Sequence, residues 1–324
     1  MRIAVTGSIA TDHLMTFPGR FTDQLVADKL DKVSLSFLVD QLEIRRGGVA
    51  ANVAFGLGCL GLRPILVGAV GKDFTDYRSW LERHGAVTDH VHVSELHHTA
   101  RFLCTTDADH NQLASFYTGA MSEARDIELA PIAAETGPFD LVLVGANDPE
   151  AMVRHSDECR HRSIPFAADP SQQLARMETS DIRRLVEGAK FLFTNEYESQ
   201  LIEQKTGWTP AEILAKVETR ITTLGPAGVR IERQGEEPIL VGPAKETAKT
   251  DPTGVGDAFR AGFLAGHSWG LSLERSAQVG CMLATLVLET VGTQEYQLDR
   301  QHFLERLGEA YGPEVVAEVR PHLG

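Results

Sequence analysis

The segment DLVLVGANDPEAMVRHSDECRHRSIPFAADP, residues 140–170, decides the fold. It begins with an apolar run at 140–146, continues with a helical pattern at 149–162, and ends with a second apolar run at 165–170. Short runs that are apolar on both faces, joined by a helix, are typical of parallel strands buried between helices. The segment therefore predicts a strand, a crossover helix and a second, parallel strand.

The same alternation runs through most of the chain. Further short apolar runs end in Gly or Asn: RIAVTG (2–7), PILVGAVG (64–71), KFLFTN (190–195) and TRITTLG (219–225). Residues 254–324 are mostly helical in pattern and are expected to cover one face of the sheet. We therefore predict an α/β protein with a doubly wound, mostly parallel central sheet flanked by helices. Ligands of such sheets bind beyond the carboxyl ends of the strands.

Two segments break this alternation and predict a small β lid. Residues 32–46 alternate like an amphipathic strand pair, and residues 101–117 read as a hairpin with a polar turn. We expect both to form one antiparallel lid over the sheet edge. The expected core comprises residues 1–12, 47–97 and 118–324, and the expected lid comprises 13–46 and 98–117.

Composition narrows the class of protein. The 45 acidic and 31 basic residues give a formal net charge of -14, which disfavours nucleic acid and anionic membranes as partners. The four cysteines are scattered, as in a reduced intracellular protein without a structural metal. The N-terminus lacks a secretory signal pattern, and the apolar stretches are too short to span a bilayer. We expect a soluble, cytoplasmic protein.

The stretch DPTGVGDAF, residues 251–259, predicts an anion site. Gly254 and Gly256 allow the unpaired N–H groups of a helix start to converge on a phosphate or oxyanion. Asp257 follows where a carboxylate can accept a proton from an attacking hydroxyl. The helix dipole is expected to favour the ionised form of this carboxyl. The alternative is an ordinary helix start capped by Thr253 or Asp257.

Sugar hydroxyls have candidate partners elsewhere in the chain. In RRGGVAAN, residues 45–52, Gly48 allows a close backbone approach and Asn52 lies one helical turn further on. Asp12 follows the first strand and can accept hydrogen bonds from a vicinal diol such as that of ribose. The alternatives are a tight turn at Gly48, a local hydrogen bond at Asn52, and a turn or cap at Asp12.

Two later strand ends offer partners for a nucleotide. Asn195 and Glu198 can share a helix face and hold magnesium through water. Thr223, Gly225 and Gly228 can present a hydroxyl and bare N–H groups to phosphates. Helix caps and tight turns are the alternatives at these positions.

The hairpin places two aromatic rings on one face. If residues 107–111 form its loop, Thr106 faces Gln112 and Phe102 lies directly opposite Phe116. Such a pair can hold a planar base, although a cross-strand aromatic pair that fills a core is an equal alternative.

The chain contains a glycine pattern of the dinucleotide-binding type, but its position argues against a nicotinamide site. Gly56, Gly58 and Gly61 spell G-x-G-x-x-G, but they lie late in an alanine-rich helix, whereas a dinucleotide fingerprint follows a strand and opens a helix. The chain also has no Walker loop. An oxidoreductase is therefore disfavoured.

These motifs together resemble the ribokinase family, also called the PfkB carbohydrate kinases. GGVAAN, NEYE, DPTGVGDAF and an aspartate soon after the first strand carry the resemblance, which covers essentially the whole chain. More narrowly, TGSIATDHLM, VSLSFLV, ASFYTGAMSEAR, GANDPEAM, AADPSQQLAR and VLETVGTQE resemble bacterial adenosine kinases of the actinobacterial type.

The resemblance implies a ribokinase-like fold and ATP-dependent, Mg²⁺-assisted phosphorylation of the 5'-hydroxyl of adenosine, which gives AMP and ADP in purine salvage. It implies Asp257 as the base and the Gly254, Val255 and Gly256 backbone as the anion hole. The remaining implied residues fall into three groups: adenosine contacts at Ser8, Asp12, Ser36, Gly48, Asn52, Phe102, Phe116, Gln172 and Gln173; ATP contacts at Asn195, Thr223, Gly225 and Gly228; and Glu198 for water-held Mg²⁺. Separately, we expect Arg176 to add positive charge near the phosphates as part of the substrate site.

The resemblance also implies K⁺ near Asp251 and the 288–293 segment, and a homodimer through the lids. Pro252 and Val255 replace two letters of the usual family loop without changing its backbone chemistry. A sugar or other nucleoside kinase of the same family remains an alternative, since only the lid face would differ. A catalytically silent nucleotide-binding protein is a third, which Asp257 disfavours.

Overall fold

The central sheet of the computed structural model has eight strands, in the order β14-β13-β12-β11-β10-β9-β1-β4. The structure describes residues 1–25 and 36–323. All neighbours from β4 to β12 pair in parallel, whereas β13 and β14 are antiparallel at one edge. The strand bounds are β1 Ile3–Thr6, β4 Ile65–Val67, β9 Leu141–Val144, β10 Phe166–Ala168, β11 Phe191–Asn195, β12 Thr219–Thr223, β13 Val229–Glu232 and β14 Ile239–Val241.

Each apolar run that the sequence singled out contains a strand of this sheet, so the predicted doubly wound core is confirmed. The run at 64–71 is split, because the short strand β5 (Ala69–Val70) leaves β4 and pairs with β6 (His92–Val93). The edge strands β13 and β14 were not predicted.

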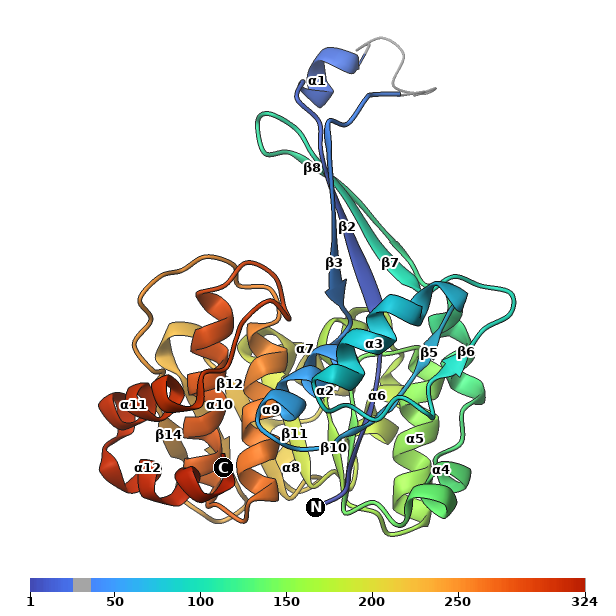
Figure 1. The fold of residues 1–324 in the computed structure, drawn as a ribbon. Coiled ribbons are helices and arrows are strands. Elements are labelled where there is room, and N and C mark those ends of the chain that lie inside the picture. Colours follow the sequence, from blue (N-terminus) through green and yellow to red (C-terminus); the bar gives the residue numbers. More distant parts are fainter. Residues whose placement is uncertain (26–35, 324) are drawn as a thin grey trace.

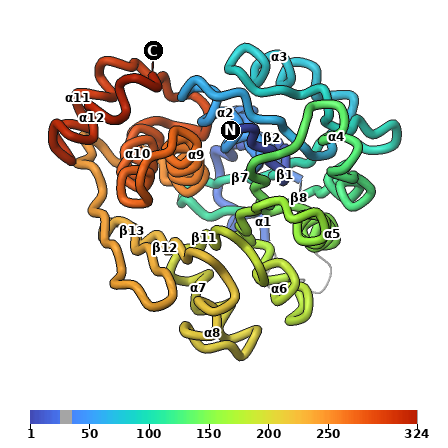
Figure 2. Tube along the Cα trace, turned by 90° about the horizontal axis from the view of Figure 1, so that it is seen from below, coloured from blue at the N-terminus to red at the C-terminus, as the bar shows by residue number. Residues whose placement is uncertain are grey.

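Helices cover both faces of the sheet (Figures 1 and 2). One face packs against α2 Val49–Cys59, α3 Thr75–Arg83, α9 Val255–Ser268, α10 Leu273–Leu288, α11 Arg300–Tyr311 and α12 Pro313–Val319. The other packs against α4 Leu129–Thr136, α5 Pro149–His161, α6 Thr179–Val186, α7 Glu196–Thr206 and α8 Pro210–Leu214. Among the described helices, none is long and apolar enough to cross a membrane.

Burial on both faces explains why the strands lack polar alternation. In β1, Ile3 and Val5 belong to the cluster beneath α2 and α9, whereas Ala4 belongs to the cluster beneath α4 and α5. Because both sets of side chains leave water, residues 3–5 of β1 are apolar on both faces. The expected helical cover by the last third of the chain is also confirmed, since α9 to α12 lie on one face.

The misleading glycine fingerprint has a packing role. Gly56 and Gly58 lie within α2, where a Cβ on Gly56 would come within 2.7 Å of the Ala261 Cβ on α9. A Cβ on Gly58 would lie 1.7 Å from the His84 carbonyl oxygen. These glycines therefore let α2 approach its neighbours closely, which is a reason unrelated to phosphate binding.

A second sheet projects from the carboxyl edge of the core (Figure 1). Its order is β3-β2-β7-β8, with β2 Ala10–Thr16, β3 Gln41–Gly47, β7 Ala100–Thr106 and β8 Gln112–Tyr117. The expectation of a purely antiparallel lid is wrong, because β2 and β7 pair in parallel. Strand β2 was not predicted, because its polar residues Asp12 and His13 hide the alternation of apolar and polar side chains that marks a strand. It begins at Ala10, before residue 13, where the lid was expected to begin.

The hairpin register is confirmed, with Phe102 opposite Phe116 and Thr106 opposite Gln112. The predicted strand pair at 32–46 is wrong in its described part, where a strand spans only Gln41–Gly47; residues 32–35 lie outside the described residues. Residues 36–40 instead lie near the lid tip, where the Phe37 ring packs against Phe17 and Phe21 at centroid distances of 4.8 and 5.3 Å.

Candidate active site

A cleft of about 740 Å³ lies between the base of the lid and the carboxyl edge of the central sheet. Most of the residues that the sequence singled out line it: Ser8, Asp12, Gly48, Asn52, Phe102, Phe116, Gln172, Gln173, Arg176, Asn195, Glu198, Thr223, Gly225, Gly254, Gly256 and Asp257. The topology brings them together because β1, β11 and β12 are parallel and end at the same edge.

An adjoining cavity of about 470 Å³ is more apolar. It shares Thr223, Gly225 and Gly256 with the cleft, so the two spaces meet at these residues. Its walls include Val255, Gly228, Pro226, Phe259, Cys281 and Leu288. The two remaining backbone candidates, Val255 and Gly228, therefore face this second cavity. An apolar cavity with a polar mouth suits an aromatic base with attached phosphates.

The start of α9 lies where the two cavities meet. Gly254 caps the helix with a φ of +77°, which glycine adopts without strain. A Cβ at this position would also lie 2.8 Å from the Thr293 side chain. The first-turn N–H groups that follow have no acceptor within the helix and, with the positive end of the dipole, form a seat for an anion.

Asp257 lies in this first turn and is held from the opposite side of the cleft. The Asn52 Nδ2 group of α2 donates a 2.8 Å hydrogen bond to Asp257 Oδ2. Burial raises the pKa of Asp257 to about 6, and the hydrogen bond from Asn52 and the charge of Arg260 partly oppose this rise. The expectation that the helix start would favour the ionised carboxyl is therefore wrong in its net effect, because desolvation outweighs the favourable contacts.

Arg260 and Asp169 form a buried ion pair beside Asp257 that the sequence did not reveal. Arg260 Nε lies 2.6 Å from Asp169 Oδ2, and Arg260 Nη2 donates to Asp169 Oδ1 at 2.7 Å. Arg260 Nη1 also donates to the Gly256 carbonyl at 3.0 Å, which braces the glycine turn. The positions of Asp169 after a strand and of Arg260 one helical turn beyond Asp257 were the available signals.

Asp12 lies on the cleft side of β2, opposite Arg45 of β3. Burial raises the pKa of Asp12 to about 6, which the charge of Arg45 partly opposes. A Cβ on Gly47 would lie 3.1 Å from Asp12 Oδ2, so glycine leaves room around this carboxylate. Ser8 Oγ accepts a hydrogen bond from the Val49 N–H at 3.0 Å, which ties the first strand to the start of α2.

A short turn, Ser171–Ala175, forms another wall of the cleft. Ser171 has a φ of +47°, a strained conformation for a residue with a Cβ, and such strain clusters at functional sites. Gln173 Oε1 is buried and has no hydrogen-bond partner among the described residues. An acceptor left in this state favours a ligand that carries a donor. Arg176 lines the same wall.

Asn195 and Glu198 form a capping box at the start of α7. Asn195 Oδ1 accepts from the Glu198 N–H at 2.7 Å, and Glu198 Oε2 accepts from the Asn195 N–H at 2.8 Å. The cap uses one carboxylate oxygen and leaves Oε1 outside the box. Burial raises the pKa of Glu198, and Arg260 opposes this effect. A partly buried carboxylate at the cleft suits a hydrated Mg²⁺.

Two predicted residues lie apart from the cleft wall. Asp251 braces the loop before α9, since Oδ2 accepts from the Gly292 N–H at 3.0 Å and Oδ1 from the Thr253 N–H at 2.9 Å. Ser36 is exposed and does not line the cleft. The neighbouring Phe37 ring holds this segment near the lid tip, so the structure does not bring Ser36 to the other site residues.

The matches to known proteins cover nearly the whole chain, including the residues that line the cleft. Residues 8–300 match the family model described as pfkB family carbohydrate kinase. The nucleoside kinase of Methanocaldococcus jannaschii is 27% identical over 308 residues, which cover 94% of this chain and 96% of that protein. The structure of Burkholderia thailandensis nucleoside kinase with inosine has a TM-score of 0.84 and 31% identity, covering 96% and 99% of the two chains. The same kinase with ADP-inosine has a TM-score of 0.81 and 32% identity, covering 96% of each chain.

Proposed function

The chain belongs to the pfkB family of carbohydrate kinases, and from this premise we propose that it is an adenosine kinase, which transfers the γ-phosphate of ATP to the 5'-hydroxyl of adenosine. It is an ATP-dependent phosphotransferase. One observation carries the proposal: the carboxylate of Asp257, held by Asn52, lies in the first turn of α9, where the two cavities meet and where a helix start suits an anion.

In this proposal the nucleoside occupies the cleft under the lid. Asp12 and Asn52 bind the ribose hydroxyls, and Phe102 and Phe116 contact the base from the same face of the lid. The unpaired Gln173 Oε1 accepts a hydrogen bond from the base. The 6-amino group of adenine is a donor of the required kind.

ATP occupies the adjoining cavity, with its base on the apolar wall and its phosphates directed toward Gly225 and the start of α9. Asp257 accepts the proton of the 5'-hydroxyl as this oxygen attacks the γ-phosphorus. The backbone N–H groups of Val255 and Gly256 stabilise the charge that develops on the transferred group. Glu198 would hold a hydrated Mg²⁺, whose charge would offset that of the phosphates.

A broader purine nucleoside kinase is the second candidate. The B. thailandensis nucleoside kinase binds inosine, and the N1–H of inosine is also a donor that Gln173 can accept. The discriminating assay is ADP release with adenosine, inosine, guanosine, cytidine and ribose. Adenosine with the highest kcat/KM supports the narrower proposal, and comparable values for inosine support the broader one.

The lid provides the matched test of the base site. Phe102→Ala removes a ring from the cleft face, whereas Leu113→Ala removes apolar surface from the other face of the same hairpin. We expect the first change to raise the KM for adenosine by about 5- to 150-fold and the second to leave it near wild type. Base–aromatic contacts contribute about 1–3 kcal/mol in comparable sites. Equal effects of the two changes would remove Phe102 from the base site.

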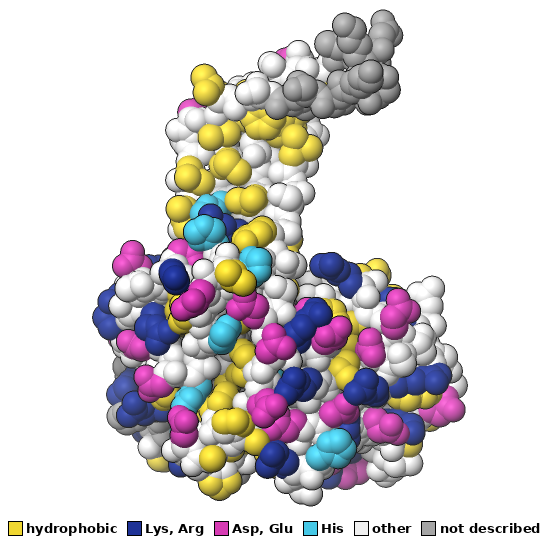
Figure 3. Space-filling view, turned by 90° about the vertical axis from the view of Figure 1, so that its right-hand side faces the viewer, with side chains coloured by type: hydrophobic (Ala, Val, Ile, Leu, Met, Phe, Trp, Pro, Cys, Tyr) yellow, Lys and Arg dark blue, Asp and Glu magenta, His cyan; other side chains and the backbone are white. Residues whose placement is uncertain are grey.

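Two further proposals concern the assembly and a cation. The lid exposes apolar side chains (Figure 3), and Leu42, Ile44 and Leu113 are 58%, 59% and 49% exposed. We propose that the chain forms a homodimer through this face. Ile44→Glu should then convert a dimer to a monomer in sedimentation equilibrium, and a monomeric wild type contradicts the proposal.

We also propose that K⁺ binds near Asp251. The test is the exchange of Na⁺ for K⁺ in the assay, which should raise turnover.

A further inference from the structure

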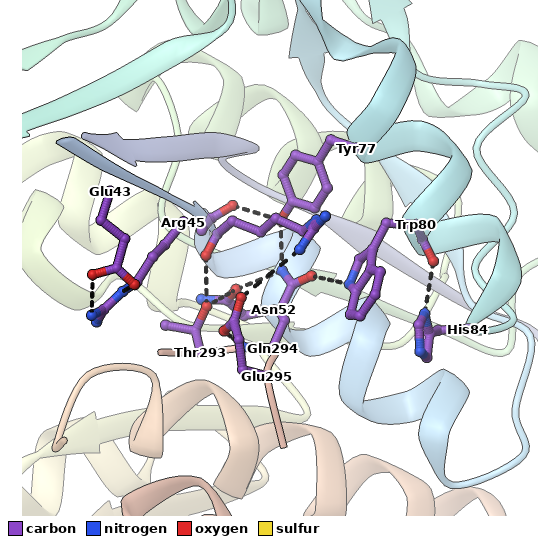
Figure 4. Close-up of polar contacts among 11 residues, drawn as sticks. Glu43, Arg45, Asn52, Tyr77, Trp80, His84, Thr293, Gln294 and Glu295 are labelled. Carbon is purple, nitrogen blue, oxygen red and sulfur yellow. Dashed lines mark hydrogen bonds and ion pairs between the residues drawn. The ribbon is translucent and has the colours of Figure 1, made fainter. Parts of the chain in front are cut away.

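A chain of buried hydrogen bonds begins at Asp257 and leads away from the cleft. It passes from Asn52 on α2 to the segment 293–294 after α10, and from there to Tyr77 and Trp80 on α3. Figure 4 shows the side chains of Asn52, Gln294, Tyr77 and Trp80 pointing toward one another. Asn52, Gln294 and Tyr77 are all buried.

The orientation of the Asn52 amide decides what Asp257 contacts. If Nδ2 faces Asp257, the amide donates a hydrogen bond to the carboxylate; if the amide turns over, Oδ1 faces the carboxylate and repels it. In the structure Nδ2 faces Asp257, because Oδ1 faces donors from Gln294 and Thr293 at 2.8 and 3.0 Å. The donors behind Asn52 therefore select the orientation that favours the ionised base.

Gln294 is the more dependable of the two donors. The Thr293 hydroxyl lies 2.8 Å from the Arg46 carbonyl and 3.0 Å from Asn52 Oδ1, but it has a single proton to give. The Gln294 amide has two protons, and it donates one to Asn52 Oδ1 and the other to the Tyr77 hydroxyl at 2.5 Å. Tyr77 in turn donates to the Gly47 carbonyl at 2.9 Å.

The orientation of Gln294 is itself set by Trp80. The indole Nε1–H donates to Gln294 Oε1 at 3.1 Å, and an indole can only donate. Gln294 must therefore present its oxygen to Trp80 and its NH₂ group to Asn52. Trp80 is held in place by its stacking on Phe55, with centroids 5.9 Å apart, and by Arg46 above its ring.

We propose that Gln294 and Trp80 are positioning residues that fix the orientation of the Asn52 amide, so that its NH₂ group donates to the Asp257 carboxylate. This inference rests on the proposed role of Asp257 for its bearing on catalysis. The same series of hydrogen bonds also connects Asp257 to the lid. Tyr77 and Thr293 donate to the carbonyls of Gly47 and Arg46, where β3 ends at the base of the lid.

The other groups that face Asp257 do not belong to this chain of hydrogen bonds. They are Arg260 on α9, Asp169 after β10 and Glu198 on α7. Changing Gln294 or Trp80 to a neutral residue leaves all three charges in place. A shift in the titration of Asp257 in such variants therefore reports the Asn52 amide.

The test is a ¹³C NMR titration of the aspartate carboxyl groups in the full chain, with the Asp257 signal assigned by its loss in Asp257→Asn. Gln294→Met removes the donor to Asn52 with little change in volume, and Trp80→Phe removes the indole N–H but keeps a ring. We expect the pKa of Asp257 to rise by about one unit in the first variant and by about half a unit in the second. The acid limb of kcat/KM should move with it.

Trp269→Phe is the control, because Trp269 stacks on His322 and lies outside the chain of hydrogen bonds. It should leave the pKa unchanged. If Gln294→Met does not fold, Trp80→Phe decides alone. An unchanged Asp257 pKa in a folded variant, with only the melting temperature lowered, overturns the proposal. The titration measures the pKa of Asp257 and does not depend on turnover. Its result can therefore be told apart from the outcome in which Asp257→Asn keeps its activity and the proposed role of Asp257 as the base is wrong.

Discussion

Protonation of the buried cleft carboxylates should set the lower pH limit of activity. Burial raises the pKa of Asp257 and of Asp12 from their ordinary value of 3.8 to about 6. Such a shift corresponds to about 3 kcal/mol of preference for the neutral form. Both roles need the ionised form, so activity is expected to fall as pH falls through about 6.

The expected size of the effect follows from the two titrations. At pH 5 each carboxyl is about one-tenth ionised, so the loss of both lowers kcat/KM for adenosine about 100-fold relative to pH 7. The logarithm of kcat/KM should therefore rise with a slope near two below pH 6. The assay is initial-rate AMP formation between pH 4.5 and 8 with Mg-ATP saturating.

Asp12→Asn separates the two contributions. The variant lacks one titrating group in the cleft, so its acid limb should keep a midpoint near pH 6 but show a slope near one. A wild-type limb centred near pH 4 would refute the reasoning, because kcat/KM reports the free enzyme and such a limb would mean that burial does not raise the pKa of the cleft carboxyls there.

Two predictions concern stability. Arg260→Gln leaves Asp169 as an uncompensated buried charge and should lower the free energy of unfolding in urea by about 3–5 kcal/mol. The control Arg20→Gln, at the exposed Arg20–Asp109 pair, should change it by less than about 1 kcal/mol; similar losses in the two variants contradict the buried pair. His155 is fully buried, and burial lowers its pKa to about 4. The unfolded state therefore binds a proton between pH 6.5 and 4 that the folded state does not, and the contribution of His155 to stability should fall by up to about 3 kcal/mol as pH falls through this window. Asp12 and Asp257, whose pKa is raised in the folded state, act in the opposite direction. Stability measured against pH should therefore lose the His155 contribution in His155→Gln, and the same pH dependence in variant and wild type refutes the reasoning.

The sequence predicted the core of the fold because its signals are local. Most of the parallel strands are short apolar runs that end in Gly, Asp, Asn or Pro, and their short length and the turn residues that follow mark them as strands buried on both faces. Strand β2 was missed because Asp12 interrupts its apolar pattern in order to face the cleft. The edge strands β13 and β14 are short and pair antiparallel, so no helix marks them.

The part of the candidate site that could be predicted is the part in which one short segment contains both the helix start and the carboxylate beside it. DPTGVGDAF contains a helix start and its carboxylate together, so Asp257 could be singled out. The Arg260–Asp169 pair and the Trp80–Gln294 hydrogen bond join residues 91 and 214 positions apart, and no local pattern connects them. The pKa of Asp257 was misjudged for a related reason, since a helix start is visible in sequence but desolvation is not.

The most direct test of the proposed activity is the rate of AMP formation from adenosine by Asp257→Asn, measured together with adenosine binding by calorimetry. The side chains are nearly identical in shape, so binding should stay within a few-fold of wild type. Turnover should fall by about 10²-fold or more, because the 5'-hydroxyl loses its proton acceptor. Turnover close to that of the wild type, with adenosine bound normally, would contradict the assignment of Asp257 as the base.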